Sequence, residues 1–285
     1  MTTSRDEIIL KAFLSRCSPE KQSRLETFLP EAKRLRLNAV APFTDIEAAG
    51  KFTSDSLLAI VHWSWFLPTL KTYSQAEQIA FLSALPSHAA LNISKSLQIP
   101  YSLMPLTEIA RSYIQNLLKR SLISYKEYLL PPEYLPASPL NELLRLSKKQ
   151  LIHLVNLLSL HDLAAELRQI VETKILKKIY SCLTEEERKR LNELSSYKEH
   201  PALPRLSLDR WDGQEDSLRV LLHRRGLIRL SLVLSGQDPD LIWYIGHQFD
   251  IGRGTTLLTF CAKVAGLQQS ESMIREIDEL MRNYL

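Results

Sequence analysis

Helix start signals recur along this chain, and they constrain its fold more than any other feature. In Ser74-Gln75-Ala76-Glu77 the serine hydroxyl and the glutamate side chain can satisfy the first unpaired amides of a helix, which is the capping-box pattern. Ser147-Lys148-Lys149-Gln150 has the same form. Asp238-Pro239-Asp240 combines a cap, a proline at the first helical position and an acid that complements the helix dipole. No stretch alternates apolar and polar residues with β-branched enrichment, so we expect essentially no sheet.

The fold class that these signals predict is all-α: helices joined by short turns in an armadillo-like, α-solenoid helical stack of two halves. Apolar residues make up 45% of the 285 residues, which is enough to build buried cores. A weak internal repeat favours the same stack. Residues 151–191 and 218–257 each place leucine-rich helices before an aromatic-bearing helix.

Four prolines divide the chain within the segment LLPPEYLPASP, residues 129–139. Proline does not continue a helix, and it disfavours the helical conformation of the residue before it. We therefore predict an N-terminal helical domain over residues 1–129, a Pro-rich linker over 130–139 and a C-terminal helical domain over 140–285.

Within these domains we expect a loop over residues 38–53, a helix from about residue 106 to 128 and another from about 161 to 182. Seven of the 8 glycines follow residue 212. We interpret those of the C-terminal domain as punctuation between short helices. They include Gly226, Gly236, Gly246, Gly252 and Gly254.

The composition narrows the class of protein. With 36 basic and 32 acidic residues the net charge is +4, without the strong excess expected of a dedicated nucleic-acid-binding protein. The cysteines, at positions 17, 182 and 261, lack any zinc spacing and are interpreted as buried free thiols in a reducing compartment. We expect no secretory signal, and the apolar-leaning run from Leu57 to Leu70 is too short to span a bilayer. These features predict a cytoplasmic protein with no metal site and no cofactor.

The densest aromatic segment is His62-Trp63-Ser64-Trp65-Phe66. On a helix Trp63 and Phe66 lie on one side while Trp65 points roughly opposite, so the three rings cannot all fill one core. Two interpretations stay open. The rings serve only as core residues, or at least one of them anchors a partner, because aromatic side chains bury much area with few rotatable bonds.

The most basic local segment is Arg224-Arg225, with Arg219, His223 and Arg229 nearby. Such a cluster either forms a solvated face or docks onto an acidic partner or onto headgroups at a membrane surface.

A glycine-bearing segment, Gly252-Arg253-Gly254-Thr255-Thr256, could bind an anion if it formed a helix start. It lacks the spacing of a phosphate-binding loop and follows no strand, so we favour a tight turn between helices. His247 precedes Asp250 by three residues. We interpret this pair as a cap or a solvated contact rather than a catalytic dyad.

Two segments resemble the armadillo-type repeats of the flagellar rotor switch protein FliG. Residues 55–99, DSLLAIVHWSWFLPTLKTYSQAEQIAFLSALPSHAALNISKSLQI, are similar to the family's middle repeat, in which a helix ending in a Leu-Pro step precedes another amphipathic helix. Residues 227–258, LIRLSLVLSGQDPDLIWYIGHQFDIGRGTTLL, are similar to its C-terminal region, in which a leucine-rich helix runs into a glycine turn and an arginine-bearing turn. Together they cover under a third of the chain.

The resemblance implies a scaffold of a flagellum-like machine. In the rotor protein the C-terminal helices carry alternating charges that engage the stator, whereas the matching residues 242–245 and 259–262 here are mainly apolar and aromatic. Torque generation is therefore not expected. Because flagella and type III secretion machines share their basal architecture, we expect a non-enzymatic structural or adaptor protein of a type III secretion basal body. It would be peripheral at the cytoplasmic face of the bacterial inner membrane.

The partners that the resemblance implies are a membrane-ring protein, a cytoplasmic ring protein and the export ATPase assembly, with no nucleic acid and no small-molecule substrate. Two alternatives stay open: a helical-repeat chaperone or regulator of secretion substrates, and a nucleic-acid-binding helical protein. The candidate partner-binding residues are Trp63, Trp65, Phe66, Arg224, Arg225, Trp243, Tyr244 and Arg253.

Overall fold

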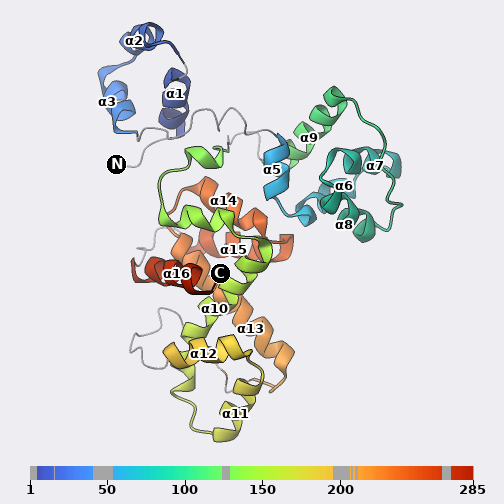
Figure 1. The fold of residues 1–285 in the computed structure, drawn as a ribbon, viewed down its shortest axis with the longest axis vertical. Helices are drawn as coiled ribbons and strands as arrows, with labels where there is room; N and C mark the ends of the chain where they lie inside the picture. The colour runs from blue at the N-terminus through green and yellow to red at the C-terminus, as the bar shows by residue number, and fades with distance from the viewer. Residues whose placement is uncertain are drawn as a thin grey trace. The chain divides into compact units, whose positions relative to one another are not determined.

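The computed structural model describes residues 5–15, 17–40, 54–123, 129–194, 206, 208, 211–264 and 271–284 (Figure 1). Within these ranges every regular element is an α-helix or a 3-10 helix, and there is no strand. The all-α prediction is therefore confirmed. The solenoid arrangement of the helices stays a prediction.

The chain forms two compact units. Unit 1 consists of residues Met1–Ala137 and Asp238–Asp250, and unit 2 of Ser138–Gln237 and Ile251–Leu285. The first division falls inside the predicted linker. The difference from the predicted domains is the helix α14 (Pro239–Gln248), which lies in the C-terminal half of the sequence but makes its contacts within unit 1.

Unit 1 begins with three short helices, of which α1 packs on both α2 and α3. After them α5 and α7 pack against α9, and α14 packs on α5. The apolar core here includes Leu57, Leu82 and Leu118. The elements are α1 (Arg5–Ser15), α2 (Pro19–Thr27), α3 (Glu31–Ala39), α5 (Ser54–Ile60), η1 (Trp63–Phe66), α6 (Leu67–Leu70), α7 (Gln75–Ala84), α8 (Ser87–Leu97), α9 (Glu108–Leu122), η2 (Pro132–Tyr134) and α14.

The beginning of the predicted linker is packed rather than extended into solvent. Leu130 is buried, its amide donates to the Asp240 carboxylate at 2.9 Å, and its carbonyl accepts from the Tyr244 hydroxyl at 2.8 Å. Both partners lie on α14, so the linker and α14 satisfy each other's buried polar groups.

Unit 2 is built on two long helices that lie side by side, α10 and α13 (Figure 1). The helices α12 and α16 pack on α10, and α15 packs on α13. The elements are η3 (Pro139–Arg145), α10 (Lys148–Leu167), α11 (Thr173–Ser181), α12 (Glu185–Leu194), α13 (Glu215–Leu234), α15 (Ile251–Val264) and α16 (Glu271–Tyr284).

A glycine allows α10 and α13 to approach closely. A Cβ atom at Gly226 would lie 1.8 Å from the carbonyl oxygen of Val155, so no larger residue fits there without moving a helix. Gly226 lies in the middle of α13, so the prediction that it separates two short helices is wrong. Gly246, Gly252 and Gly254 likewise lie inside helices. Gly236, with φ 81°, does follow the end of α13 as a turn residue.

The predicted helix starts are confirmed. Both capping boxes form, at Ser74 and at Ser147, and the Asp238 side chain accepts from the amide of Asp240 at the start of α14. The helix expected from about residue 161 to 182 is instead two helices, because the Ser147 cap starts α10 and that helix ends at Leu167 before α11. The helix expected from about 106 to 128 is α9, which begins after its Thr107 cap; residues 124–128 lie outside the described ranges. So does most of the loop expected over 38–53, although α3 continues to residue 39.

Candidate protein-binding groove

The arginines of α13 point in different directions. Arg229 is 3% exposed and donates to Asp162 of α10 at 3.0 Å and to Glu276 of α16 at 2.7 Å. Arg225 is also buried, with its Nε atom 3.7 Å from Asp162. These two cations join α13 to α10 and to α16. Arg225, a predicted partner-binding residue, is therefore a packing residue whose charge faces an internal carboxylate.

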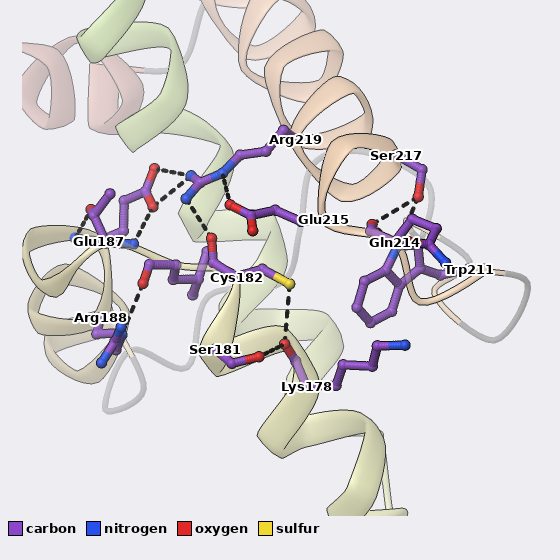
Figure 2. A network of polar contacts seen from close by, with 12 residues as sticks. Lys178, Ser181, Cys182, Glu187, Arg188, Trp211, Gln214, Glu215, Ser217 and Arg219 are labelled. Carbon is purple, nitrogen blue, oxygen red and sulfur yellow. Dashed lines mark hydrogen bonds and ion pairs between the residues drawn. The ribbon is translucent and has the colours of Figure 1, made fainter.

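Arg219 takes part in a second network of polar contacts within unit 2 (Figure 2). Its guanidinium lies 2.7 Å from Glu187 and 3.7 Å from Glu215, and it donates to the carbonyl of Cys182. Glu187 also accepts from the amide of Thr184, as the cap of α12. The network ties α13 to the turn between α11 and α12, and it neutralises the Arg219 charge.

The start of α13 is fixed beside this network (Figure 2). The Trp211 indole donates to the carbonyl of Gln214 at 2.9 Å, and the Lys178 ammonium lies 5.9 Å from the centre of the Trp211 ring. Hydrogen bonds from the Ser217 hydroxyl and the Gln214 amide lower the pKa of Asp212. These contacts involve side chains of α11 and of the loop, so the first turn of α13 is anchored to its own unit.

Arg224 has a different environment, because it is exposed and lines a groove between α10, α13 and α15. The groove has a volume of about 610 Å³. A second hollow of about 500 Å³ shares Arg224 and Phe260 with it and continues along α15 to Lys263. We call the two hollows together the basic groove. It is lined by Ile152, Asn156, Arg219, Val220, His223, Arg224, Leu227, Ile251, Gly252, Arg253, Thr255, Thr256, Thr259, Phe260 and Lys263.

The basic groove has cations and no carboxylate in its lining. Residues 217–237 and 251–264, which supply most of its walls, contain arginines and a lysine but no Asp or Glu. Because Arg219 is paired with Glu187 and Glu215, the exposed cations of the lining are Arg224 and Lys263, and Arg253 adds a third positive charge beside them. Like-signed charges along a concave surface attract ligands of the opposite sign.

Arg253 is positioned by a short polar chain. Its Nε atom donates to Nε2 of His223 at 2.9 Å, and Nδ1 of His223 lies 2.9 Å from the Asn156 side-chain oxygen. A guanidinium can only donate, so Nε2 of His223 accepts and the imidazole is neutral. Its proton is then on Nδ1, which donates to the Asn156 side-chain oxygen. The chain orients the Arg253 guanidinium at the first turn of α15.

The lining of the groove also contains apolar side chains. Val220 is 69% exposed on α13, Phe260 is half-buried on α15, and Leu227 forms part of the floor. An exposed apolar side chain beside a cationic one suits a ligand that offers both an anionic and an apolar group. The described residues contain no cluster of His, Cys, Asp or Glu that could hold a metal ion.

In unit 1, three rings form a stack that joins η1 to α14. The His247 ring lies between Trp65, at 4.1 Å between ring centres, and Trp243, at 3.8 Å. The Trp65 indole donates to the Phe249 carbonyl at 2.9 Å, and the amide of His62 donates to the carbonyl of His247 at 2.8 Å. Burial lowers the pKa of His247 to about 4, so the ring is neutral at pH 7.

The aromatic candidates thus serve mainly to pack unit 1. Phe66 and Tyr244 are fully buried, so a partner cannot contact either of them in the folded unit. Trp63, Trp65 and Trp243 are half-buried. His247 is buried within the stack, which corrects its interpretation as a cap or solvated contact.

The structure brings the candidates together in two separate places. Trp65 and Trp243 meet through His247 in unit 1, while Arg224 and Arg253 meet at the basic groove in unit 2. Gly252 to Thr256 form the first turns of α15, not the tight turn that the sequence predicts. Sequence reasoning placed His223 in the basic cluster around Arg224 but missed Val220, Phe260 and Lys263 as groove residues, although the absence of acids from residues 217–237 and 251–264 was a visible signal.

Comparison of the chain with protein-family models, with curated proteins and with solved structures finds no match. Among the described residues, no helix combines the length and the apolar character needed to cross a membrane.

Proposed function

We propose that the protein is a non-enzymatic helical adaptor of a type III secretion basal body, and that the basic groove of unit 2 is where it holds a partner protein. The observation that carries the proposal is that exposed Arg224 and exposed Val220 both line a groove whose lining has no carboxylate. Protein interfaces favour arginine beside apolar side chains, because together they offer charge and buried area.

The secretion apparatus enters through the resemblance to FliG. The second FliG-like segment, residues 227–258, includes Leu227, Arg253 and Thr256 of the groove. The proposed partners are a membrane-ring protein, a cytoplasmic ring protein and the export ATPase assembly. The proposed location is the cytoplasmic face of the bacterial inner membrane.

A photo-crosslinking side chain in place of Val220 tests this function in cells that carry the native secretion machinery. The matched control places the same side chain at Val171, which is 95% exposed in unit 2 but lies outside the groove. Mass spectrometry of the crosslinked products should recover a basal-body component from position 220 and not from position 171.

Two other results would redirect the proposal. Recovery of a single secreted client in equal amount would favour the chaperone alternative. Recovery of no secretion or flagellar component at position 220 would contradict the adaptor function.

A further inference from the structure

We infer that the basic groove receives an acidic amphipathic helix, whose carboxylates face Arg224, Arg253 and Lys263 and whose apolar side chain sits between Val220 and Phe260. This inference rests on the proposed function in one respect, since it requires a protein partner. It adds the chemistry of the partner's segment.

The length of the groove suits a short helix. Its lining on α15 runs from Ile251 to Lys263, which at 1.5 Å per residue is about 18 Å, or roughly three helical turns. A helix lying in such a groove contacts it through side chains three, four and seven residues apart. One face of a three-turn helix can therefore carry an apolar side chain with an acidic side chain on either side of it.

The distribution of charge selects an acidic occupant. The basic residues of α13 that lie near internal carboxylates are Arg219, Arg225 and Arg229. Among the described residues neither Arg224 nor Lys263 forms an ion pair, and both side chains are exposed. An acidic segment would supply the sign of charge that the groove lining lacks, while a basic segment would be repelled from it.

The apolar part of the lining favours a protein over a nucleic acid or a membrane. A phosphate backbone is bound through a run of cations and releases many counterions, whereas here the lining combines three cations with the apolar side chains of Val220, Leu227 and Phe260. A hollow between helices also matches a convex helix better than the flat surface of a bilayer. The floor and the exposed valine would bury the apolar face of the incoming helix.

A display library of random helical peptides, selected against the full-length protein, tests the inference without assuming a partner sequence. The same library is selected in parallel against Arg224→Glu and against Lys174→Glu, an equal charge change at an exposed position of α11 outside the groove. Circular dichroism and the melting temperature should be the same for both variants, because neither side chain packs in a core.

The peptides enriched on the unchanged protein should carry acids three or four residues apart around one apolar residue. The tightest of them, measured by fluorescence anisotropy, should lose about tenfold or more in affinity to Arg224→Glu and be unchanged for Lys174→Glu. Replacing its acids by lysine should restore binding to Arg224→Glu. Its affinity for the unchanged protein should fall as salt is added.

Three outcomes would overturn the inference: enrichment of neutral or basic peptides, equal binding to Arg224→Glu, or an Arg224-dependent preference for a single-stranded oligonucleotide or a phosphatidylglycerol vesicle over any peptide. The two proposals fail separately. If no acidic peptide is enriched but Val220 crosslinks a basal-body component, the adaptor function stands and the acidic helix does not. If acidic peptides bind and the crosslink finds no such component, the groove chemistry stands and the secretion assignment fails.

Discussion

Two helices late in the chain, α14 and α16, complete their units by opposite kinds of contact. In unit 1, α14 is held by neutral rings and by hydrogen bonds around His247, Tyr244 and Asp240. In unit 2, α16 is held by ion pairs, between Glu276 and Arg229 at 2.7 Å and between Glu279 and Arg190 at 2.9 Å. A buried ring stack depends on its rings staying neutral, whereas a buried ion pair depends on both partners being present. The two attachments should therefore respond to different perturbations.

The largest effect is expected from Arg229→Leu. It leaves Glu276 without its buried cation and leaves Asp162 with Arg225 alone, at 3.7 Å, which should cost about 3–5 kcal/mol of unit 2 stability. Chemical denaturation followed through Trp211, which lies in unit 2 while the other tryptophans lie in unit 1, measures the loss. Arg282→Leu, at an exposed ion pair, should change little. An equal effect of the two variants would contradict the charged attachment of α16.

Acid should weaken unit 1 through His247. Its pKa is about 4 in the folded protein against 6.5 for the ordinary side chain, so the unfolded state binds more protons between these values. The contribution is fully present above pH 6.5 and is lost as the pH falls toward 4, by about 3 kcal/mol. Urea denaturation at a series of pH values, followed by hydrogen exchange of residues 239–248, measures it. His247→Phe should flatten this pH dependence while exposed His88→Gln should not; identical slopes would disprove the role of the stack.

Gly226→Ala tests the close approach of α10 and α13. The added Cβ meets the Val155 carbonyl, so the helices must separate, and we expect unit 2 to lose about 2–3 kcal/mol. Gly236→Ala is the matched control, because its Cβ would meet nothing and only its φ of 81° is unfavourable, at about 1 kcal/mol. Thermal unfolding of both variants compares them. If Gly226→Ala were the milder change, the helices would not be in close contact.

The smallest effect is expected from Glu279→Gln. Arg190 is buried but also lies 3.3 Å from Glu193, and Glu279 is partly exposed, so the loss should be about 0.5–1 kcal/mol. The difference from the unchanged protein should shrink in high salt, because salt screens the exposed part of the pair. A salt-independent difference would indicate packing rather than charge.

Sequence reasoning succeeded where the determining contacts are local. The caps at Ser74, Ser147 and Asp238 are formed with residues no more than three positions away, so residue type and spacing were sufficient. Gly226 was misinterpreted because its reason lies on another helix, in the carbonyl of Val155. The place of α14 was missed for the same cause, since the partners of Tyr244 and Asp240 are more than one hundred residues earlier.

The same difference between local and distant contacts decides which residues of the candidate site could be predicted. Residue type was enough to single out Arg224, which belongs to the most basic local segment, and Arg253, which belongs to the glycine-bearing segment. The inward direction of Arg225 was not visible, since neighbouring positions on a helix point about 100° apart and only the packing of α10 fixes which one meets Asp162. Val220 and Phe260 could not be distinguished from core residues by type alone.

The discontinuity of unit 1 has a consequence for how the protein is made. A ribosome delivers residues 238–250 only after the whole of residues 138–237, so the first unit to begin is not the first that can be finished. Until α14 emerges, the Leu130 amide and the Trp65 indole lack the acceptors that they have in the folded chain. The nascent protein therefore carries an incomplete aromatic surface through much of its synthesis, which is a period in which a chaperone that recognises exposed aromatic side chains can act on it.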